Sequence, residues 1–368
     1  MAKTNISSLG EFGLIKHLTK DIRPKDHTTR YGIGDDAAVL EFKGYQTLVT
    51  SDLLLEGIHF NLEYVPLKHL GYKAAVVNFS DIYAMNGRPT QLIVSLGISK
   101  RFSVEDLEEL YAGLRTACDL YGVDIVGGDT TSSMTGLTIS ITCIGEAKKE
   151  DVVYRNGAQV NDLICCTGNL GAAYMGLQLL ERERAVFNSS PKVGHESPVD
   201  FYGCGLLRGL PDRAEEYDPK PAFEGKEYIL ERQLKPEAHK DIIAALKEAG
   251  IRPTAMMDIS DGLSSELLHI CTQSGVGCAV YADKLPIDYQ SVAMAEELNM
   301  DIVTCALNGG EDYELLFTIS QKDYEKILPV EDVNIIGYIQ RAELGCHLIG
   351  RNGEEITLKA QGFNAFEE

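Results

Sequence analysis

The chain has 368 residues, with 34 Lys and Arg against 55 Asp and Glu, and it therefore carries a net charge of −21. Because affinity for nucleic acids and for anionic lipid surfaces comes mainly from clustered Lys and Arg, this balance disfavours both as direct partners. An apolar fraction of 44% supports packed cores and excludes global disorder, and the length favours two domains.

The first half of the sequence predicts alternating strands and helices. Short β-rich runs predict strands over 46–50, 91–98 and 137–145. A run rich in Ala and Leu predicts a helix over 67–79, and the clearest helical period covers 103–121. The second helix has a capping-box-like start at Ser103 and Asp106, and Gly122 ends it.

A charged break at 148–151 divides the sequence, and we expect one domain over 1–148 and a second over 149–368. The elements predicted after the break are the strands 163–167 and 314–319 and the helices 172–180, 240–249 and 262–272. Residues 182–227 carry five of the twelve prolines and few periodic apolar positions. We expect that segment to be an exposed excursion.

Several acidic residues follow short apolar runs and stand beside Gly, Ser or Thr. They are Asp35, Asp36, Asp52, Asp81, Asp129, Asp258, Asp261, Glu311 and Asp312. A strand that ends in this way delivers a carboxylate to the rim of a sheet, where little bulk blocks a ligand. Each motif alone is also common turn chemistry, and Asp258 or Ser260 could simply cap the helix that begins near Gly262.

The motifs favour metal-assisted phosphate chemistry over a dinucleotide fold. Residues 32–37 satisfy the pattern G-x-G-x-x-A, but no buried strand precedes them and two carboxylates would face the pyrophosphate. The phosphate-binding signatures of P-loop enzymes and protein kinases are absent from the sequence. Acidic turns can meet phosphates through divalent cations, and Mg²⁺ prefers oxygen ligands. The sequence therefore favours a metal-dependent, phosphate-handling α/β enzyme.

The sequence predicts a cytoplasmic protein. No stretch approaches the ~20 apolar residues of a membrane helix, and the start lacks the layout of a signal peptide. The nine cysteines are an odd number without a Cys-x-x-Cys pair, which makes a poor disulfide framework. We interpret most of them as small core hydrophobes.

Six motifs together resemble the thiamine-monophosphate kinase family. They are Gly32–Ala37, Thr50–Asp52 with Glu56–Phe60, Asn78–Asp81, Gly127–Thr131, Met257–Leu263 and Gly309–Leu315. They occur in the order of the family, and the resemblance covers nearly the whole chain. The wider superfamily also contains aminoimidazole ribonucleotide synthetase, selenophosphate synthetase and a hydrogenase maturation factor. The absence of a cysteine before Cys118, and a C-terminus without one, argue against the last two.

The resemblance implies a fold and an activity. The expected fold is an N-terminal α+β domain that forms a barrel across a homodimer, followed by a C-terminal α/β domain. The expected activity is transfer of the γ-phosphoryl group of ATP to thiamine monophosphate, with several Mg²⁺ ions. The alternatives are another ATP-dependent synthetase of the superfamily and a catalytically silent nucleotide- or metal-binding protein.

The resemblance also implies roles for residues at matched positions. The expected Mg²⁺ ligands are Asp36, Thr50, Ser51, Asp52, Asp81, Asp129, Asp258 and Asp261. The expected ATP contacts are Tyr111, Gly128, Asp129, Arg155 and Ser260. The expected contacts to thiamine monophosphate are His59, Glu311 and Phe363. No general base is expected, because a phosphate monoester with a second pKa near ~6 is already an anionic nucleophile at neutral pH.

Overall fold

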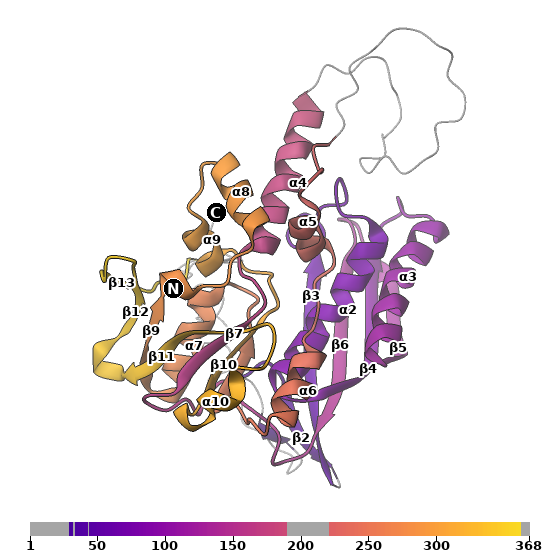
Figure 1. The fold of residues 1–368 in the computed structure, drawn as a ribbon. Helices are drawn as coiled ribbons and strands as arrows, with labels where there is room; N and C mark the ends of the chain where they lie inside the picture. Colours follow the sequence, from indigo (N-terminus) through magenta and orange to yellow (C-terminus); the bar gives the residue numbers. More distant parts are fainter. Residues whose placement is uncertain (1–28, 32–33, 43, 190–220, 362–368) are drawn as a thin grey trace, which may run out of the picture.

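The computed structural model describes residues 29–31, 34–42, 44–189 and 221–361. They form two sheets that lie side by side in Figure 1, the first on the right and the second on the left. Phe363 and most of the predicted excursion, residues 190–220, lie outside the described residues.

The first sheet has six strands in the order β1-β2-β3-β6-β4-β5. They are β1 (Thr29–Tyr31), β2 (Ala38–Phe42), β3 (Tyr45–Leu55), β4 (Arg88–Ile98), β5 (Asp124–Ser132) and β6 (Thr138–Ala147). Helices α2 (Leu67–Ala84) and α3 (Val104–Tyr121) pack on each other beside it. The predicted strands and helices of this half are confirmed, although β3 and α2 run five residues beyond the predicted ends.

Helix α3 begins and ends where local chemistry predicts. The Ser103 side chain accepts the backbone N–H of Asp106 at 3.2 Å, and the Asp106 carboxylate accepts the backbone N–H of Ser103 at 2.8 Å. Gly122 follows the last turn in the left-handed conformation, with φ 71°. The capping box and the glycine stop are therefore confirmed.

Burial in the first sheet alternates along the strands. In β6, Ile139, Ile141 and Cys143 are buried in the core that includes α2 and α3, whereas the residues between them are half-buried. On the other face, Leu53 of β3 is 53% exposed and Val126 of β5 is 57% exposed. Among the described residues, α2 and α3 thus cover one face of the sheet, and its other face is open.

The second sheet has seven strands in the order β13-β12-β9-β11-β7-β10-β8. They are β7 (Leu163–Thr167), β8 (Ala255–Asp258), β9 (Val276–Tyr281), β10 (Leu315–Ile319), β11 (Val333–Arg341), β12 (Cys346–Ile349) and β13 (Glu355–Thr357). Strand β7 is confirmed at its predicted bounds. It lies between β10 and β11, and buried side chains from its two faces belong to different core clusters.

Seven helices of the described chain follow the first sheet. They are α4 (Ala172–Ser189), α5 (Glu227–Leu234), α6 (Lys240–Glu248), α7 (Leu263–Ser274), α8 (Tyr289–Glu297), α9 (Ile302–Asn308) and α10 (Tyr324–Ile327). The expectation of an excursion from residue 182 is wrong for 182–189, because α4 continues to Ser189. Glu183 is buried there and accepts the backbone N–H of Ala222 at 3.0 Å. In the part of the chain described here, no helix combines the length and apolarity needed to cross a membrane.

A buried ion cluster stands at the start of β10. The carboxylate of Glu314 lies 2.6 Å from Nη2 of Arg232 and 2.7 Å from Nε2 of His239, and it accepts a hydrogen bond from the Thr167 hydroxyl. Burial acts to raise the pKa of Glu314, but His239 and Arg232 outweigh it and hold that pKa at about 2. Because the folded-state pKa is depressed, this stabilisation is present above pH ~4.5 and is lost as the pH falls toward 2.

We expect Glu314→Gln to lower the free energy of unfolding by about 3–5 kcal/mol at pH 7, because it leaves the buried Arg232 without its counter-charge. Urea unfolding measures the change. The matched control is Glu231→Gln, which breaks an exposed pair with Lys235 and should cost about 0.5 kcal/mol or less. Equal losses of unfolding free energy in the two variants would contradict the role of Glu314 as the buried counter-charge of Arg232.

Candidate active site

Three carboxylates from distant parts of the sequence meet between the two sheets. Asp36 precedes β2, Asp81 lies on α2 and Asp258 ends β8. One carboxylate oxygen from each lies within 4.8 Å of the others. We call these three residues the acid cluster.

Hydroxyl groups orient two members of the cluster. The Thr50 hydroxyl donates to Oδ2 of Asp81 at 2.6 Å, and the Ser80 hydroxyl donates to Oδ2 of Asp258 at 2.5 Å. Thr50 belongs to the predicted set, whereas Ser80 was not assigned a role from the sequence. Its place directly before Asp81 in the Asn-Phe-Ser-Asp motif is the signal that could have identified it.

The acid cluster concentrates negative charge where water has little access. Burial raises the pKa of Asp81 well above its usual value, and the charges of Asp52, Asp258 and Asp36 raise it further. Burial and then Asp36 raise the pKa of Asp258 to about 8, and burial raises that of Asp52 to about 6. Such a group of oxygen donors is stabilised in its ionised form by a cation. The donor chemistry fits Mg²⁺, which prefers oxygen ligands.

Arg155 supplies positive charge to this site. Its guanidinium donates to both oxygens of Asp36, at 2.9 Å from Nε and 2.6 Å from Nη2. Its Nε lies 3.7 Å from Asp35, and its backbone N–H donates to Asp35 at 3.1 Å. Burial acts to lower the pKa of Arg155, but Asp36 and Asp35 raise it. Arg155, a predicted ATP contact, and Asp36, a predicted metal ligand, therefore neutralise each other in this structure.

A cavity of about 1250 Å³ opens beside the acid cluster. Eight of the predicted site residues line it: Ser51, Asp52, His59, Asp81, Asp258, Ser260, Asp261 and Glu311. Its wall combines residues of β3 and α2 with the loops that follow β8 and precede β10. The cavity is large enough for more than one small-molecule substrate.

One wall of the cavity is a stripe of α2. Lys73, Val77 and Asp81 line it at four-residue spacing, which places them on one face of the helix. The Lys73 ammonium lies 3.1 Å from Oε2 of Glu311, and Gln233 donates to the same oxygen at 3.0 Å. The sequence identified Glu311 but not Lys73 or Gln233. The spacing of Lys73 from Asp81 is the signal that was available.

Two loops of the second sheet pack closely at the cavity. The backbone N–H of Glu311 donates to the carbonyl of Ser260 at 2.7 Å. A Cβ on Gly310, where φ is 70°, would stand 2.6 Å from that carbonyl, so this position requires glycine. Asp312 points the other way and accepts the backbone N–H of Gly171 at 2.7 Å, at the start of α4. Glu311 therefore lines the cavity, whereas its neighbour Asp312 binds the start of α4.

Three of the predicted residues that the structure describes are not brought to the acid cluster. Tyr111 is half-buried on α3 and packs against the first core. Gly128 and Asp129 lie on the exposed edge strand β5, and a Cβ on Gly128 would stand 1.7 Å from the Val94 carbonyl. Phe363 lies outside the described residues.

The register of the first sheet sets the position of Asp129. Asp129 pairs with Ser95 of β4, Ser95 with Ser140 of β6, and Ser140 with Leu53 of β3. Three strand spacings separate Asp129 from Leu53, or about 14 Å. Paired residues share a face, so Asp129 lies on the open face of the sheet, whereas Asp52 points to the helices. Within one chain Asp129 does not reach the acid cluster.

Comparison with known families places two domain models on the chain. Residues 34–147 match the model described as AIR synthase related protein, N-terminal domain. Residues 215–361 match the corresponding C-terminal domain. These matches agree with the two mixed sheets of the structure.

Comparison with individual proteins gives full-length similarity. The chain is 32% identical to a thiamine-monophosphate kinase of Aquifex aeolicus, over 92% of this chain and 94% of the relative. It is 30% identical to a thiamine-monophosphate kinase of Bacillus subtilis, over 98% of this chain and 100% of the relative. A solved structure described as AaThiL complexed with AMPPCP and TMP superposes with a TM-score of 0.78 at 30% identity and covers 100% of both chains.

Proposed function

The chain belongs to the thiamine-monophosphate kinase family, and from this premise we propose that it transfers the γ-phosphoryl group of ATP to thiamine monophosphate. The products are thiamine diphosphate and ADP. The observation that carries the proposal is the acid cluster at the edge of a cavity of about 1250 Å³. The relative of the same fold that binds AMPPCP and TMP together supports it.

The chain does not need a general base for this reaction. The acceptor is a phosphate monoester with a second pKa near ~6, so its oxygen is already an anionic nucleophile at neutral pH. The obstacle is the repulsion between two polyanions. Bound Mg²⁺ supplies the charge neutralisation and in-line alignment on which phosphoryl transfer depends.

We assign the Mg²⁺ ligands to Asp36, Asp81 and Asp258, with Asp52 and Asp261 at the adjoining cavity wall. Thr50 holds Asp81 through a hydrogen bond of 2.6 Å and fixes the direction of its carboxylate. The predicted role of Ser51 as a further ligand remains a proposal.

Arg155 is proposed to change partners when ATP binds. In this structure its guanidinium makes two hydrogen bonds to Asp36. A metal ion at the acid cluster would compete for the same carboxylate oxygens. The released guanidinium, whose fork geometry matches a phosphate, would then contact ATP together with Ser260.

The part of the cavity that His59 and Glu311 line is proposed to hold thiamine monophosphate. Glu311 would accept a hydrogen bond from the aminopyrimidine, with Lys73 and Gln233 fixing its carboxylate. His59 would face the substrate phosphate, and Phe363 is retained as a proposed stacking partner for a thiamine ring.

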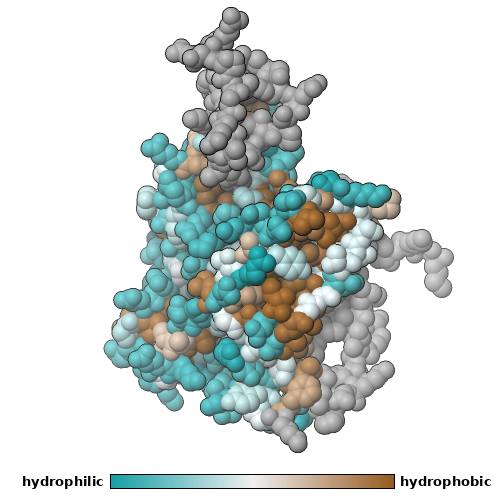
Figure 2. All heavy atoms as spheres, turned by 90° about the vertical axis from the view of Figure 1, so that its right-hand side faces the viewer, coloured by the Kyte–Doolittle hydropathy of each residue, from teal (hydrophilic) through white to brown (hydrophobic). Residues whose placement is uncertain are grey.

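The open face of the first sheet supports a homodimer. Figure 2 shows brown apolar side chains gathered on the side of the molecule where this sheet lies. Leu53, Ile93 and Val126 are exposed large apolar residues of β3, β4 and β5. We propose that two copies pair through these sheets into a barrel. Gly128 and Asp129, which lie away from the acid cluster of their own chain, would then complete the nucleotide site of the other copy, and Tyr111 would remain a proposed ATP contact.

The choice of acceptor tests the proposed reaction. With ATP and Mg²⁺, thiamine monophosphate should support ADP formation, whereas thiamine, which has no phosphate, should not. Turnover with thiamine alone, or ADP formation that does not depend on any acceptor, would contradict the proposal.

Magnesium should stabilise the protein more strongly at higher pH. In the metal-free state the pKa values of Asp258 and Asp52 are raised to about 8 and about 6. The folded protein then binds more protons than the unfolded chain between pH ~4 and ~8, and its stability falls as pH rises through this window. Because Mg²⁺ binds the ionised carboxylates, it should raise the melting temperature by roughly 5 °C more at pH 8 than at pH 6. Thermal scans with and without MgCl₂ at matched ionic strength measure the difference, and equal shifts at the two pH values would contradict the assignment.

A further inference from the structure

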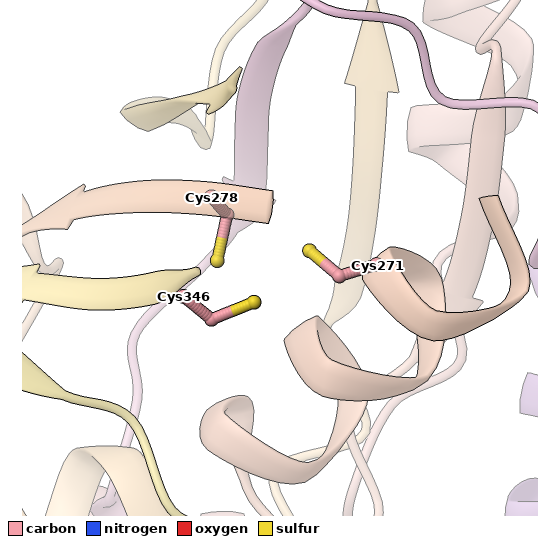
Figure 3. A group of neighbouring side chains, drawn as sticks. All are labelled: Cys271, Cys278 and Cys346. Carbon is pink, nitrogen blue, oxygen red and sulfur yellow. The ribbon is translucent and has the colours of Figure 1, made fainter. Parts of the chain in front are cut away.

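Three cysteines converge at the C-terminal end of α7, outside the proposed active site (Figure 3). Cys271 lies near the end of α7, Cys278 lies on β9 and Cys346 begins β12. Their sulfur atoms all lie within 4.8 Å of one another. In Figure 3 the three side chains point toward a common centre from three different elements.

Two local features of the fold produce this convergence. Gly275 ends α7 in the left-handed conformation with φ 67°, and the chain reverses there into β9, which carries Cys278. Strand β12 pairs with β9 in parallel, and Cys346 stands directly opposite Cys278 in that register. Side chains of paired residues share a face of the sheet, so both sulfurs lie on the side that α7 covers.

We propose that Cys271, Cys278 and Cys346 form a binding site for Zn²⁺. Thiolates are soft ligands that favour zinc, whereas the all-oxygen acid cluster suits Mg²⁺. Zn–S bonds of about 2.3 Å at tetrahedral angles correspond to sulfur–sulfur separations of about 3.8 Å. Small rotations of side chains that already lie within 4.8 Å of one another reach that geometry.

The fourth position of the site is left to water or a small ligand. Among the described residues, no other Cys, His, Asp or Glu joins this group of three. Cys271 and Cys278 are buried, whereas Cys346 is half-buried and gives the site a route to solvent. Three protein ligands and one exchangeable position is an established zinc arrangement.

Metal binding at this site would displace the thiol protons of the cysteines and release them to solvent. The site would tie α7 to the edge of the second sheet formed by β9, β12 and β13.

Cobalt titration of the reduced, chelator-treated full chain tests the proposal. One equivalent of Co²⁺ should give the near-ultraviolet thiolate-to-cobalt charge-transfer band and the strong visible bands of a tetrahedral site, and Zn²⁺ should abolish them. Cys346→Ser should weaken Co²⁺ binding at least about tenfold. The matched control Cys118→Ala changes a buried cysteine of α3 outside the group and should leave the titration unchanged. Absence of the charge-transfer band in the wild-type protein, or an unchanged Co²⁺ affinity in Cys346→Ser, would overturn the proposal.

Alkylation of wild-type protein provides a second measurement that needs no folded variant. Zn²⁺ should protect Cys346 from iodoacetamide, as measured by peptide mass spectrometry, and Mg²⁺ should not. Equal labelling with and without Zn²⁺ would overturn the site. The purified metal-free protein could contain a disulfide between two of the three cysteines. If the protein then fails to bind Zn²⁺ after that disulfide is reduced, the site is also overturned. Neither measurement depends on thiamine-monophosphate kinase activity.

Discussion

Replacing Asp81 by Asn is expected to lower kcat/KM for thiamine monophosphate by about a hundredfold or more. Loss of a group that merely orients a metal ligand already costs about 10–100-fold, and Asp81 is proposed to be a ligand itself. The amide keeps the size of the side chain but removes the charge. Steady-state kinetics over a range of Mg²⁺ concentrations measure the loss, and added Mg²⁺ should not restore activity.

The melting temperature of Asp81→Asn shows whether Asp81 binds the metal or only supports the fold. Burial and three neighbouring carboxylates disfavour the charge on Asp81. Asp81→Asn should therefore melt no lower than wild type in the absence of Mg²⁺ at pH 8, and Mg²⁺ should stabilise it less. The matched control Asp119→Asn changes an exposed acid on α3 and should alter neither property. Undiminished turnover in Asp81→Asn would contradict the metal assignment.

Co-expression of Asp81→Asn with Asp129→Asn is expected to restore activity that each variant lacks alone. If the active site combines the acid cluster of one copy with Asp129 of the other, a mixed dimer has one intact site and one site with both changes. Random pairing makes half of the dimers mixed, so activity should return to about a quarter of the wild-type value for a two-fold symmetric dimer. Separate affinity tags on the two chains allow the mixed dimer to be purified and assayed.

The pair Asp81→Asn and Asp258→Asn is the control for this experiment. Both residues belong to the acid cluster of a single chain, so a mixed dimer of these variants has one substitution in each site and should remain inactive. If the Asp81 and Asp129 variants also fail to complement each other, although the mixed dimer forms, the site is completed within one chain and the proposed role of the second copy is wrong.

Local chemistry made parts of the fold predictable from the sequence. Helix α3 has its own capping box and glycine stop, and β7 is a short apolar run followed by Gly168. Strand β8 is different, because Ala255–Asp258 has no β-branched residue and becomes a strand by pairing with β10. Strand β5 includes Gly127 and Gly128, and its extent depends on pairing with β4. Long-range pairing of this kind leaves little trace in a single sequence.

The candidate site was predictable where short motifs carry it. Asp36, Asp81 and Asp258 each stand in a recognisable motif, and the structure brings them together. Lys73 was missed because it lies in an ordinary helical run, and its contact with Glu311 depends on how α2 is rotated toward the second sheet. The three cysteines were missed for a similar reason. Their positions form no metal-binding spacing, and they converge through the parallel pairing of β9 and β12.

Product stoichiometry tests the central claim most directly. ATP, Mg²⁺ and thiamine monophosphate should be incubated with the purified full chain, and the products separated by chromatography. A kinase of this class should form one ADP for each thiamine diphosphate, with no free phosphate, and chelation of Mg²⁺ should stop both. Release of free phosphate with ADP, or ADP formation without thiamine diphosphate, would instead indicate another ATP-dependent enzyme of the superfamily and would contradict the account.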